Sequence, residues 1–362
     1  MKSRAVGVFA LLLGAMSHSL AGEALTAKNA LKLMSPGINL GNTLEAIPTA
    51  TSWGNPEPNE AVFKAMRSAG FRSVRIPAAW SQYSDTNHTV SASWMNHVEK
   101  VVKMARKADL IVMLNIHWDG GWLEPTFKDR DAARRRLAAF WKQIGTRFKS
   151  YDDHLIFAGT NEVHVKDNYG APTAENAEVQ NGYNQLFVNT VRKTGGMNSK
   201  RFLVVQSYNT NIGHALKFNA SLPQDSVKGK LMMEVHYYDP YNFTLNEQSS
   251  VWQWGAGATD PKATETWANE AYVDQQFALV KKQFVDRGVP VLMGEYAAMS
   301  KKQFPGYEKF QRAWVGYVTK SAYRHGVVPM LWDIGIDSGL FNRKTGAPQF
   351  TGLIDVIISA CR

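Results

Sequence analysis

The 362-residue chain contains a single cysteine, Cys361, which is next to last in the sequence. Without an intramolecular disulfide, an exported domain of this size has to rely on its hydrophobic core for stability. Hydrophobic residues make up 44% of the sequence, enough for one large domain or two ordinary ones. Repeats, low-complexity tracts and Pro/Ser/Thr-rich linkers are also missing, which argues against an attached binding module.

Motifs of several enzyme classes are missing as well. The sequence has no GxSxG elbow, no HExxH motif and no cysteine cluster. His117 and Asp119 are of ligand type, but no second metal-binding motif accompanies them. We therefore expect no metal and no other cofactor.

The first residues have the layout of a secretory signal peptide. Lys2 and Arg4 precede a short apolar run, and the small residues Ser19 and Ala21 follow it. The run is too short for a permanent membrane span, although an uncleaved anchor is the competing interpretation. We expect residues 1–21 to be removed and residues 22–362 to form the single mature domain of a secreted protein, either periplasmic or extracellular.

The formal net charge of +10 raises the question of a nucleic-acid or anionic partner. The basic residues are scattered, however, and the densest run, at residues 134–136, falls in an amphipathic helical pattern. We interpret that run as a solvated helix face. We expect a monomer that binds no nucleic acid and, after loss of the leader, no membrane.

Eight short and nearly continuously apolar runs predict strands that are buried on both faces. They lie at residues 37–42, 72–77, 110–117, 155–162, 202–208, 231–238, 289–296 and 327–333. Helical patterns separate them, such as the apolar stripe of Leu137, Phe140, Trp141, Ile144 and Phe148. This alternation predicts a single-domain (β/α)8 TIM barrel of the α/β class. An open doubly wound sheet is the alternative, but no Gly-rich phosphate fingerprint follows the first run.

Polar and ionisable residues gather at the ends of at least six of these runs. In a barrel the carboxyl ends of the strands converge on one face, where active sites are built. The residues are Arg75, His117, Asp119, Asn161, Glu162, His236, Tyr238, Glu295 and Trp332. Any one of them alone is more simply a hydrogen-bonded rim residue, but chance explains the whole set poorly.

Glu162 and Glu295 end the fourth and seventh runs, which face each other across such a barrel. Cleavage of a glycosidic bond needs two carboxyl groups, one protonated and one ionised. Arg75 is the obvious cation to keep one of them ionised, but spacing alone does not say which glutamate it contacts.

Tryptophans in or beside the predicted loops fit a sugar ligand, whose C–H faces stack on indole rings. They are Trp53, Trp118, Trp122, Trp252, Trp254, Trp267 and Trp332. Residues 239–270 form a long loop that holds three of them, and we interpret it as one wall of an open cleft. For each tryptophan separately, packing within a loop is an equally good explanation.

Over essentially the whole mature length the chain resembles glycoside hydrolase family 5, the cellulase and mannanase family. The resemblance begins with GINLGNTLEA and SWGNP. It continues at the positions of the family's shared active-site set, namely Arg75 in VRIP, His117 in NIHW, Asn161, Glu162, His236, Tyr238, Glu295 in MGEY and Trp332 in LWD. One departure is Val163, where the family usually has proline after the acid/base.

The resemblance implies a role for each position in a retaining double displacement. Glu162 is implied as the acid/base and Glu295 as the nucleophile. Arg75 and Tyr238 would hold Glu295, Asn161 would bind the sugar 2-hydroxyl, and Trp332 would lie under the sugar ring. His117 and His236 would line the site, with His236 nearer the acid/base. Retention further predicts carboxyl groups about 5–5.5 Å apart.

The resemblance thus predicts a secreted endo-β-1,4-glucanase acting on β-glucan polysaccharide or oligosaccharide. The alternatives on the same scaffold are a β-mannanase, a xyloglucanase or a mixed-linkage glucanase, because the catalytic set does not discriminate between them. A non-catalytic sugar-binding barrel is a more distant alternative. Such a protein would be free to lose a carboxylate, whereas this chain has both.

Overall fold

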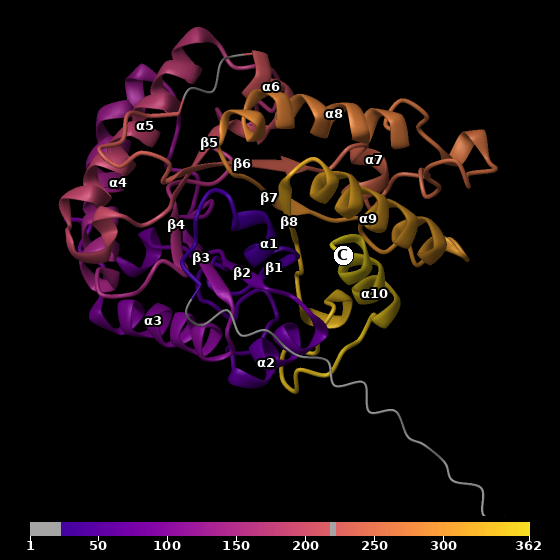
Figure 1. Ribbon diagram of the computed structural model, residues 1–362, viewed down its shortest axis with the longest axis horizontal. Coiled ribbons are helices and arrows are strands. Elements are labelled where there is room, and N and C mark those ends of the chain that lie inside the picture. The colour runs from indigo at the N-terminus through magenta and orange to yellow at the C-terminus, as the bar shows by residue number, and fades with distance from the viewer. Residues whose placement is uncertain (1–22, 218–221) are drawn as a thin grey trace, which may run out of the picture.

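In the computed structural model, which describes residues 23–217 and 222–362, eight parallel strands close into a barrel (Figure 1). Each strand pairs with its neighbours in sequence, and β1 closes the ring by pairing with β8. The strands are β1 (Gly37–Asn39), β2 (Ser73–Ile76), β3 (Ile111–Asn115), β4 (Leu155–Ala158), β5 (Leu203–Asn211), β6 (Leu231–Tyr237), β7 (Val291–Tyr296) and β8 (Val327–Leu331). The predicted TIM barrel is confirmed, with one strand in each of the eight apolar runs.

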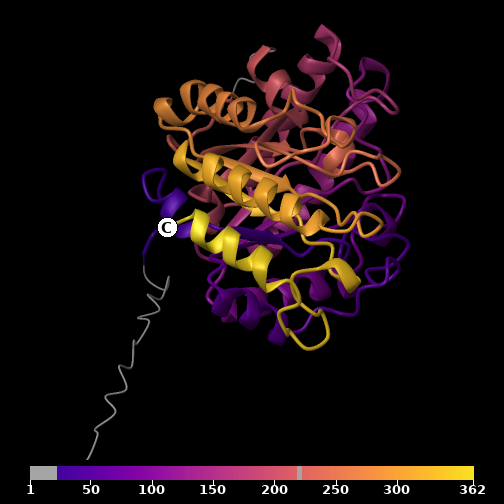
Figure 2. The ribbon, with the colours of Figure 1, turned by 90° about the vertical axis from the view of Figure 1, so that its right-hand side faces the viewer.

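Helices alternate with the strands, and most of them cover the outside of the barrel (Figures 1 and 2). They are α1 (Ala30–Met34), α2 (Glu60–Ala69), α3 (Ala92–Lys107), α4 (Phe127–Phe148), α5 (Ala174–Lys193), α6 (Ile212–Lys217), α7 (Tyr241–Thr244), α8 (Glu270–Gln283), α9 (Tyr307–Arg324) and α10 (Thr351–Ala360). None of the helices within the described residues is both long and apolar enough to span a membrane. The predicted signal peptide lies outside the described residues.

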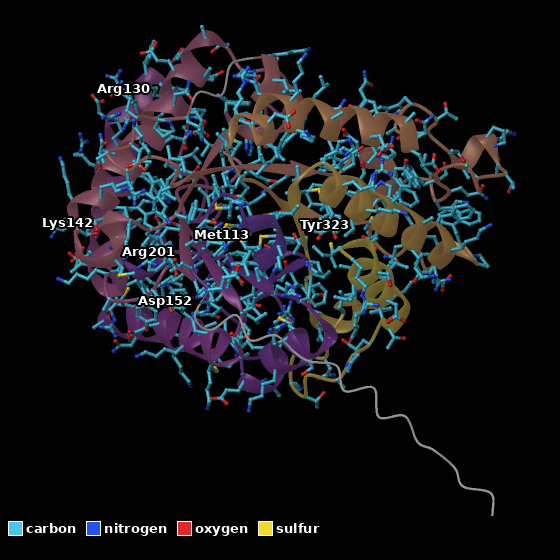
Figure 3. All side chains as sticks on the ribbon, in the orientation of Figure 1. Met113, Arg130, Lys142, Asp152, Arg201 and Tyr323 are labelled. Atoms are coloured by element: carbon cyan, nitrogen blue, oxygen red, sulfur yellow. The ribbon has the colours of Figure 1, made fainter. Side chains whose placement is uncertain are left out.

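Local sequence signals set the helix ends. The side chain of Asn59 accepts hydrogen bonds from the backbone amides of Ala61 and Val62 at the start of α2, and Gly70 ends that helix at φ 113°. Thr126 caps α4 in the same way by accepting from the amide of Asp129. The apolar stripe predicted in α4 is fully buried against the barrel. The charged side chains Arg130 and Lys142 of α4 instead lie at the periphery (Figure 3).

The barrel interior has an apolar lower layer and a polar upper layer. Met113, Val204, Met232 and Leu292 belong to a buried cluster that also includes Leu33 from α1. Helix α1 and the residues before it therefore close the amino-terminal end of the barrel. One layer higher, the buried side chains are polar or charged, namely Asn39, Arg75, Asn115, Gln206 and Glu234. This polar layer carries the candidate active site.

Candidate active site

Arg75, on β2, lies at the centre of the polar layer and is fully buried. Its Nη1 donates to Oε1 of Glu295 at 2.8 Å, which answers the question that spacing left open. Its Nη2 donates to Oδ1 of Asn161, and its Nε lies 3.0 Å from Oε1 of Glu234. Asn39 accepts a further hydrogen bond from Nη1 at 3.1 Å. One guanidinium thus orients both the nucleophile candidate and the asparagine beside the acid candidate.

Glu295 is held by three charged or polar neighbours. Besides the Arg75 contact, the Tyr238 hydroxyl donates to Oε2 at 3.1 Å, and Nδ1 of His236 lies 3.7 Å from the same oxygen. Burial raises the pKa of Glu295 above its usual range, while the charges of His236 and Arg75 oppose that rise. Burial and the neighbouring carboxylate raise the pKa of Tyr238 well above its ordinary value, so its hydroxyl remains a donor.

Glu162 faces the cleft, with 37% of its side chain exposed, against 6% for Glu295. Its Oε1 lies 2.6 Å from Nδ1 of His236. Burial tends to raise the pKa of Glu162, but the hydrogen bond and the charge of His236 outweigh it and lower the pKa. His236 is thus closer to Glu162 than to Glu295, as the family resemblance implies.

The two glutamates offer carboxylate oxygens within 4.8 Å of each other. That distance agrees with the roughly 5–5.5 Å separation of carboxyl groups in retaining glycosidases. Inverting enzymes need a gap of about 6.5–9.5 Å to admit a water molecule. The spacing therefore fits attack by one carboxylate and proton donation by the other.

Val163, at the departure from the family pattern, is buried and carries a backbone contact. Its carbonyl accepts from the amide of Asn209 at 2.8 Å, which joins the segment after β4 to the last part of β5. Glu162 has φ 46°, in the left-handed region. A proline at 163 would favour an extended backbone at 162. Valine is thus compatible with the conformation in which Glu162 reaches His236.

His117 and Trp332 form a stacked pair, with ring centroids 5.5 Å apart and planes within 7°. Burial lowers the pKa of His117 well below its usual value, and the charges of Arg75 and His236 add to this effect. The imidazole is therefore neutral at pH 7 and can both donate and accept hydrogen bonds.

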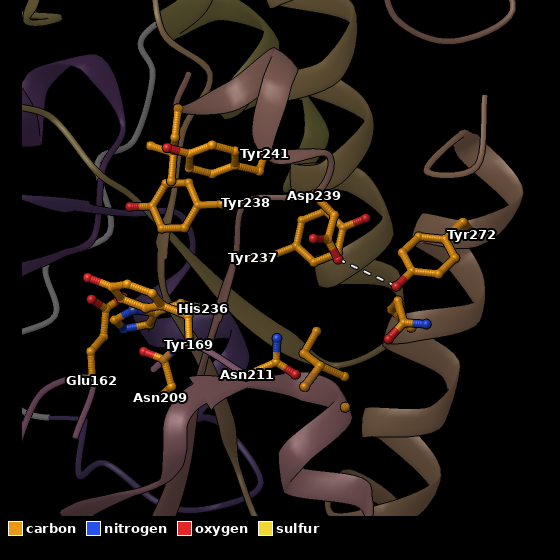
Figure 4. A pocket seen from close by; sticks show the side chains of 14 residues that line it. Glu162, Tyr169, Asn209, Asn211, His236, Tyr237, Tyr238, Asp239, Tyr241 and Tyr272 are labelled. Carbon is orange, nitrogen blue, oxygen red and sulfur yellow. Dashed lines mark hydrogen bonds and ion pairs between the residues drawn. The ribbon is translucent and has the colours of Figure 1, made fainter. Parts of the chain in front are cut away.

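Two cavities extend from Glu162. The larger, of about 690 Å³, is lined by Asn209, His236, Tyr238, Tyr241 and Tyr272, among others (Figure 4). The smaller, of about 460 Å³, lies over the loops after β3 and β4 and is lined by His117, Trp118, Asn161 and Lys166, among others. Glu162 and Tyr169 line both cavities, so the two spaces meet at the acid candidate.

The tryptophans divide into exposed and packed residues. Trp53, Trp118 and Trp267 are 38%, 48% and 52% exposed and are free to face a ligand. Trp254 is buried, and its indole N–H donates to the carbonyl of Ala268 at 2.7 Å, so its prediction as a sugar platform was wrong. Trp252 stacks on Phe304, with ring centroids 5.5 Å apart. The segment 239–270 also contains α7 and a 3-10 helix (Pro261–Ala263), so it is not one irregular loop.

Glu234 and Gln206 were not predicted, although both contact the predicted set. Glu234 bridges Arg75 and His236, and Gln206 donates to Glu234 at 2.7 Å. A signal for Glu234 exists in LMMEVHYY, where a charge interrupts an apolar strand two residues before His236. Side chains two apart share one face of a strand, so the two must point into the barrel together.

Two groups of side chains in the described residues are close enough to hold a metal ion. Asp152, Asp153 and His154 form one, and Glu162, His236 and Glu295 form the other. In the second group both ring nitrogens of His236 already lie against carboxylates, Nδ1 at 2.6 Å from Glu162 and Nε2 at 3.2 Å from Glu234. Such a ring carries protons on its nitrogens and has no lone pair for a metal.

Comparison with known proteins decides the family. The model of the cellulases, glycosyl hydrolase family 5, matches residues 37–338. The chain belongs to glycoside hydrolase family 5. It is therefore a glycoside hydrolase, and the predicted resemblance is confirmed.

Two curated relatives and one solved structure illustrate the similarity. A xyloglucan-specific endo-β-1,4-glucanase of Bacteroides ovatus is 41% identical over 354 residues, which are 92% of this chain and 70% of the relative. Endoglucanase A of Paenibacillus barcinonensis is 36% identical over 362 residues, covering 93% and 90% of the two chains. The solved structure of a Bacteroides ovatus family 5 xyloglucanase with a XXXG heptasaccharide has a TM-score of 0.90 at 40% identity and covers 94% of this chain and 77% of that one.

Proposed function

We propose that the protein is a retaining endo-β-1,4-glucanase in which Glu162 is the acid/base and Glu295 the nucleophile. The observation that carries this proposal is that the two glutamates have carboxylate oxygens within 4.8 Å of each other at the mouth of the barrel. Their contacts and exposure support these roles, because Glu295 has Arg75 and Tyr238 as fixed donors whereas Glu162 faces the cleft. The pKa directions, raised for Glu295 and lowered for Glu162, require a separate proton source for Glu162. Family 5 membership supports the same assignment.

The geometry divides the reaction into two steps. First, a carboxylate oxygen of Glu295 attacks the anomeric carbon while the leaving glycosidic oxygen receives a proton from Glu162, which gives a covalent glycosyl-enzyme. Second, a water molecule deprotonated by Glu162 attacks the same carbon and releases Glu295 as a carboxylate. In this proposal Asn161, which accepts a hydrogen bond from Arg75, binds the sugar 2-hydroxyl, and the stacked His117–Trp332 pair holds the ring.

Cleavage within a chain, and not at its end, is supported by the two cavities. Because both meet at Glu162, a polysaccharide can run across the acid/base and leave the site in two directions. Their volumes of about 690 and 460 Å³ lie in the usual range for ligand sites. A pocket closed on one side would instead fit an enzyme that releases terminal sugars.

Xyloglucan is the proposed preferred substrate among the β-1,4-glucans. The Bacteroides ovatus relative is xyloglucan-specific by name, and the similar solved structure holds a XXXG heptasaccharide. The larger cavity also has room beside the main chain, because it extends from Glu162 and His236 to Tyr272 on α8. A branched glucan needs such lateral space for its side-chain sugars.

A reducing-sugar assay on xyloglucan, carboxymethylcellulose, barley β-glucan and glucomannan tests the substrate. We expect the highest kcat/KM on xyloglucan and measurable hydrolysis of carboxymethylcellulose. Preference for glucomannan would make the protein a mannanase. Binding of oligosaccharides without any cleavage during long incubation would favour a sugar-binding barrel.

Two further measurements test the residue roles. Glu295→Gln should lower kcat by roughly 10⁵-fold or more, as loss of a nucleophile does, with an unchanged circular dichroism spectrum. The matched control is Glu308→Gln, an exposed carboxylate on α9, which should retain wild-type activity. Proton NMR of the first product should show the β-anomer, and an initial α-anomer would contradict retention.

A further inference from the structure

Glu234 is a third carboxylate, one layer below the reacting pair. It is fully buried on β6, and its Oε1 lies 3.0 Å from Nε of Arg75 and 3.2 Å from Nε2 of His236. Its Oε2 accepts from Nε2 of Gln206 at 2.7 Å. A buried carboxylate is costly unless it is paired and hydrogen-bonded, and Glu234 is both. It lines neither of the two cavities, so any influence on the reaction passes through the side chains that it contacts. These are Arg75, His236 and Gln206, and Oε1 of Gln206 accepts from the backbone amide of Glu162 at 3.1 Å.

The neighbouring strand leaves room for this carboxylate. A Cβ atom at Gly294 would lie 1.9 Å from Oε1 of Glu234, which is far inside the van der Waals contact distance. Gly294 directly precedes Glu295 on β7, and its carbonyl accepts from Nδ2 of Asn39 at 2.8 Å. The residue before the nucleophile is therefore a glycine because Glu234 occupies the space of its side chain.

His236 lies between two carboxylates, with one ring nitrogen against each. Nδ1 is 2.6 Å from Glu162 and Nε2 is 3.2 Å from Glu234. Because an ionised carboxylate only accepts hydrogen bonds, we infer that Nε2 carries a proton toward Glu234, and that Nδ1 and Glu162 share one further proton. Burial tends to lower the pKa of His236, but the charge of Glu295 and the hydrogen bonds with Glu162 and Glu234 raise it to about 10. In the resting enzyme this proton is therefore on His236, and Glu162 is ionised.

We propose that Glu234 is a positioning residue that holds His236 as an imidazolium, so that His236 stores the proton which Glu162 delivers to the leaving group. This inference rests on the proposed retaining mechanism. Glu234 also forms an ion pair with Arg75, the same cation that pairs with Glu295 and favours its ionised form.

The proton and charge balance of the first step is complete without another reactant. The Nδ1 proton of His236 moves to Glu162, the Glu162 proton moves to the leaving oxygen, and the bond from that oxygen to the anomeric carbon breaks. Glu295 forms an ester and loses its negative charge as His236 loses its positive charge. The net charge of the cluster is thus the same before and after the step.

The second step reverses these transfers. Water gives one proton to Glu162, which passes it to Nδ1 of His236. The oxygen of the water molecule then bonds to the anomeric carbon while the ester bond to Glu295 breaks. The negative charge of Glu295 reappears 3.7 Å from Nδ1 and favours the imidazolium again. Each half-reaction therefore moves the proton in the direction that the charge of Glu295 dictates.

Removal of the Glu234 charge has a predictable sign. The charged or titratable groups that act on Glu234 or His236 are Arg75, His117, Glu162 and Glu295, while Tyr238 and Glu45 act on Glu295. Glu234→Gln leaves Arg75 with one carboxylate partner fewer and His236 beside a neutral amide. Both Glu295 and His236 should then lose their protons at lower pH.

The test compares Glu234→Gln with wild type in two ways. In the bell-shaped pH profile of kcat/KM, both limbs should move to lower pH by about one unit. Independently of activity, 15N NMR of the substrate-free enzyme should show the His236 ring doubly protonated at pH 7 in wild type and titrating about one unit or more lower in the variant. The His236 signals are assigned with His236→Gln.

Two other variants separate charge from packing. Asp333→Asn removes an equally buried carboxylate that pairs with Arg343 outside the cluster, and it should leave both limbs in place. Glu234→Asp keeps the negative charge but moves it one methylene farther from Arg75 and His236. It should shift the His236 titration in the same direction as Glu234→Gln does, by less than half as much. If Glu234→Gln does not fold, the Asp variant decides, and no shift in it would overturn the proposal.

The outcomes distinguish this inference from the proposed function. A lower kcat in Glu234→Gln with unmoved limbs would reduce Glu234 to a packing role. A neutral His236 in wild type at pH 7 would exclude the stored proton even if hydrolysis is retaining. Absence of hydrolysis by wild type would contradict the proposed function, whereas the NMR titration would still report the charge of His236.

Discussion

At the scale of single residues, the hydroxyl of Tyr238 offers a sharp test of how Glu295 is held. It donates to Oε2 at 3.1 Å, and hydrogen bonds to charged groups contribute about 1.5–3 kcal/mol. We expect Tyr238→Phe to lower kcat roughly 10- to 100-fold. Loss of the donor also raises the pKa of Glu295. Since Glu295 must be ionised to attack, the acid limb of the kcat/KM profile should move to higher pH.

The matched control is Tyr317→Phe. Tyr317 also donates its hydroxyl to a carboxylate, Oδ2 of Asp274 at 3.0 Å, but at the contact between α8 and α9. Its loss should leave kcat and the acid limb unchanged. Equal pH profiles for Tyr238→Phe and wild type would contradict the assignment of Glu295 as the group held by this hydroxyl.

At the scale of secondary-structure elements, the strands could be predicted because a strand buried on both faces leaves a continuous apolar run. The predicted ends are less exact. The run at 155–162 extends beyond β4, which ends at Ala158, because Asn161 and Glu162 have left the sheet to reach Arg75 and His236. The catalytic candidates themselves could be predicted from their position at strand ends and from the family motifs.

Other parts of the site could not be predicted because tertiary packing decides them. Trp254 and Trp267 occur in the same segment. Trp254 is nevertheless buried and donates a hydrogen bond to the carbonyl of Ala268, whereas Trp267 is half exposed. The local sequence does not determine which of the two tryptophans is buried. The two hydrogen-bonding partners of His236 likewise come from β4 and from its own strand, so only the folded barrel shows that the ring lies between two carboxylates.

Lys301 fixes the segment after β6 and supports a prediction about that element. It is 1% exposed, and its Nζ donates to the carbonyls of Asn242 at 3.0 Å, Asn246 at 2.5 Å and Ser249 at 3.3 Å. Lys301→Met leaves these three acceptors without the cation. We expect a loss of stability of about 1–3 kcal/mol per acceptor that stays buried, faster proteolysis within residues 240–250, and a higher KM because Tyr241 lines the larger cavity.

Lys302→Met is the matched control, since Lys302 is the adjacent lysine and is exposed. It should behave as wild type in urea unfolding, limited proteolysis and kinetics. Should Lys301→Met change kcat but neither KM nor the proteolysis rate, the segment would be held by other contacts.

At the scale of the whole molecule, the residues before β1 close the amino-terminal end of the barrel. Leu25 is fully buried and Leu33 is 2% exposed, and both belong to the interior cluster with Met113 and Met232. Truncation of such a side chain leaves a cavity, so Leu33→Ala should cost about 2–5 kcal/mol in the free energy of unfolding. Leu279→Ala, at a side chain 40% exposed on α8, should cost much less. Urea unfolding of both variants measures the difference. Equal values would mean that Leu33 contributes no more to stability than a surface residue does.

The contacts of the residues before β1 also limit where a signal peptide can be cleaved. The backbone amide of Leu25 donates to Oδ2 of Asp153 at 3.0 Å, and its carbonyl accepts from Nζ of Lys230 at 3.2 Å. Cleavage after Ala21 leaves these contacts intact, whereas cleavage beyond Leu25 would remove the buried side chain and both bonds. We therefore predict an exported product that begins at Gly22, identified by intact mass and amino-terminal sequencing after expression of the full-length chain. Ala21→Arg should block processing and keep the protein in the membrane fraction. Wild-type protein that stays in the membrane at full mass would instead favour an uncleaved anchor.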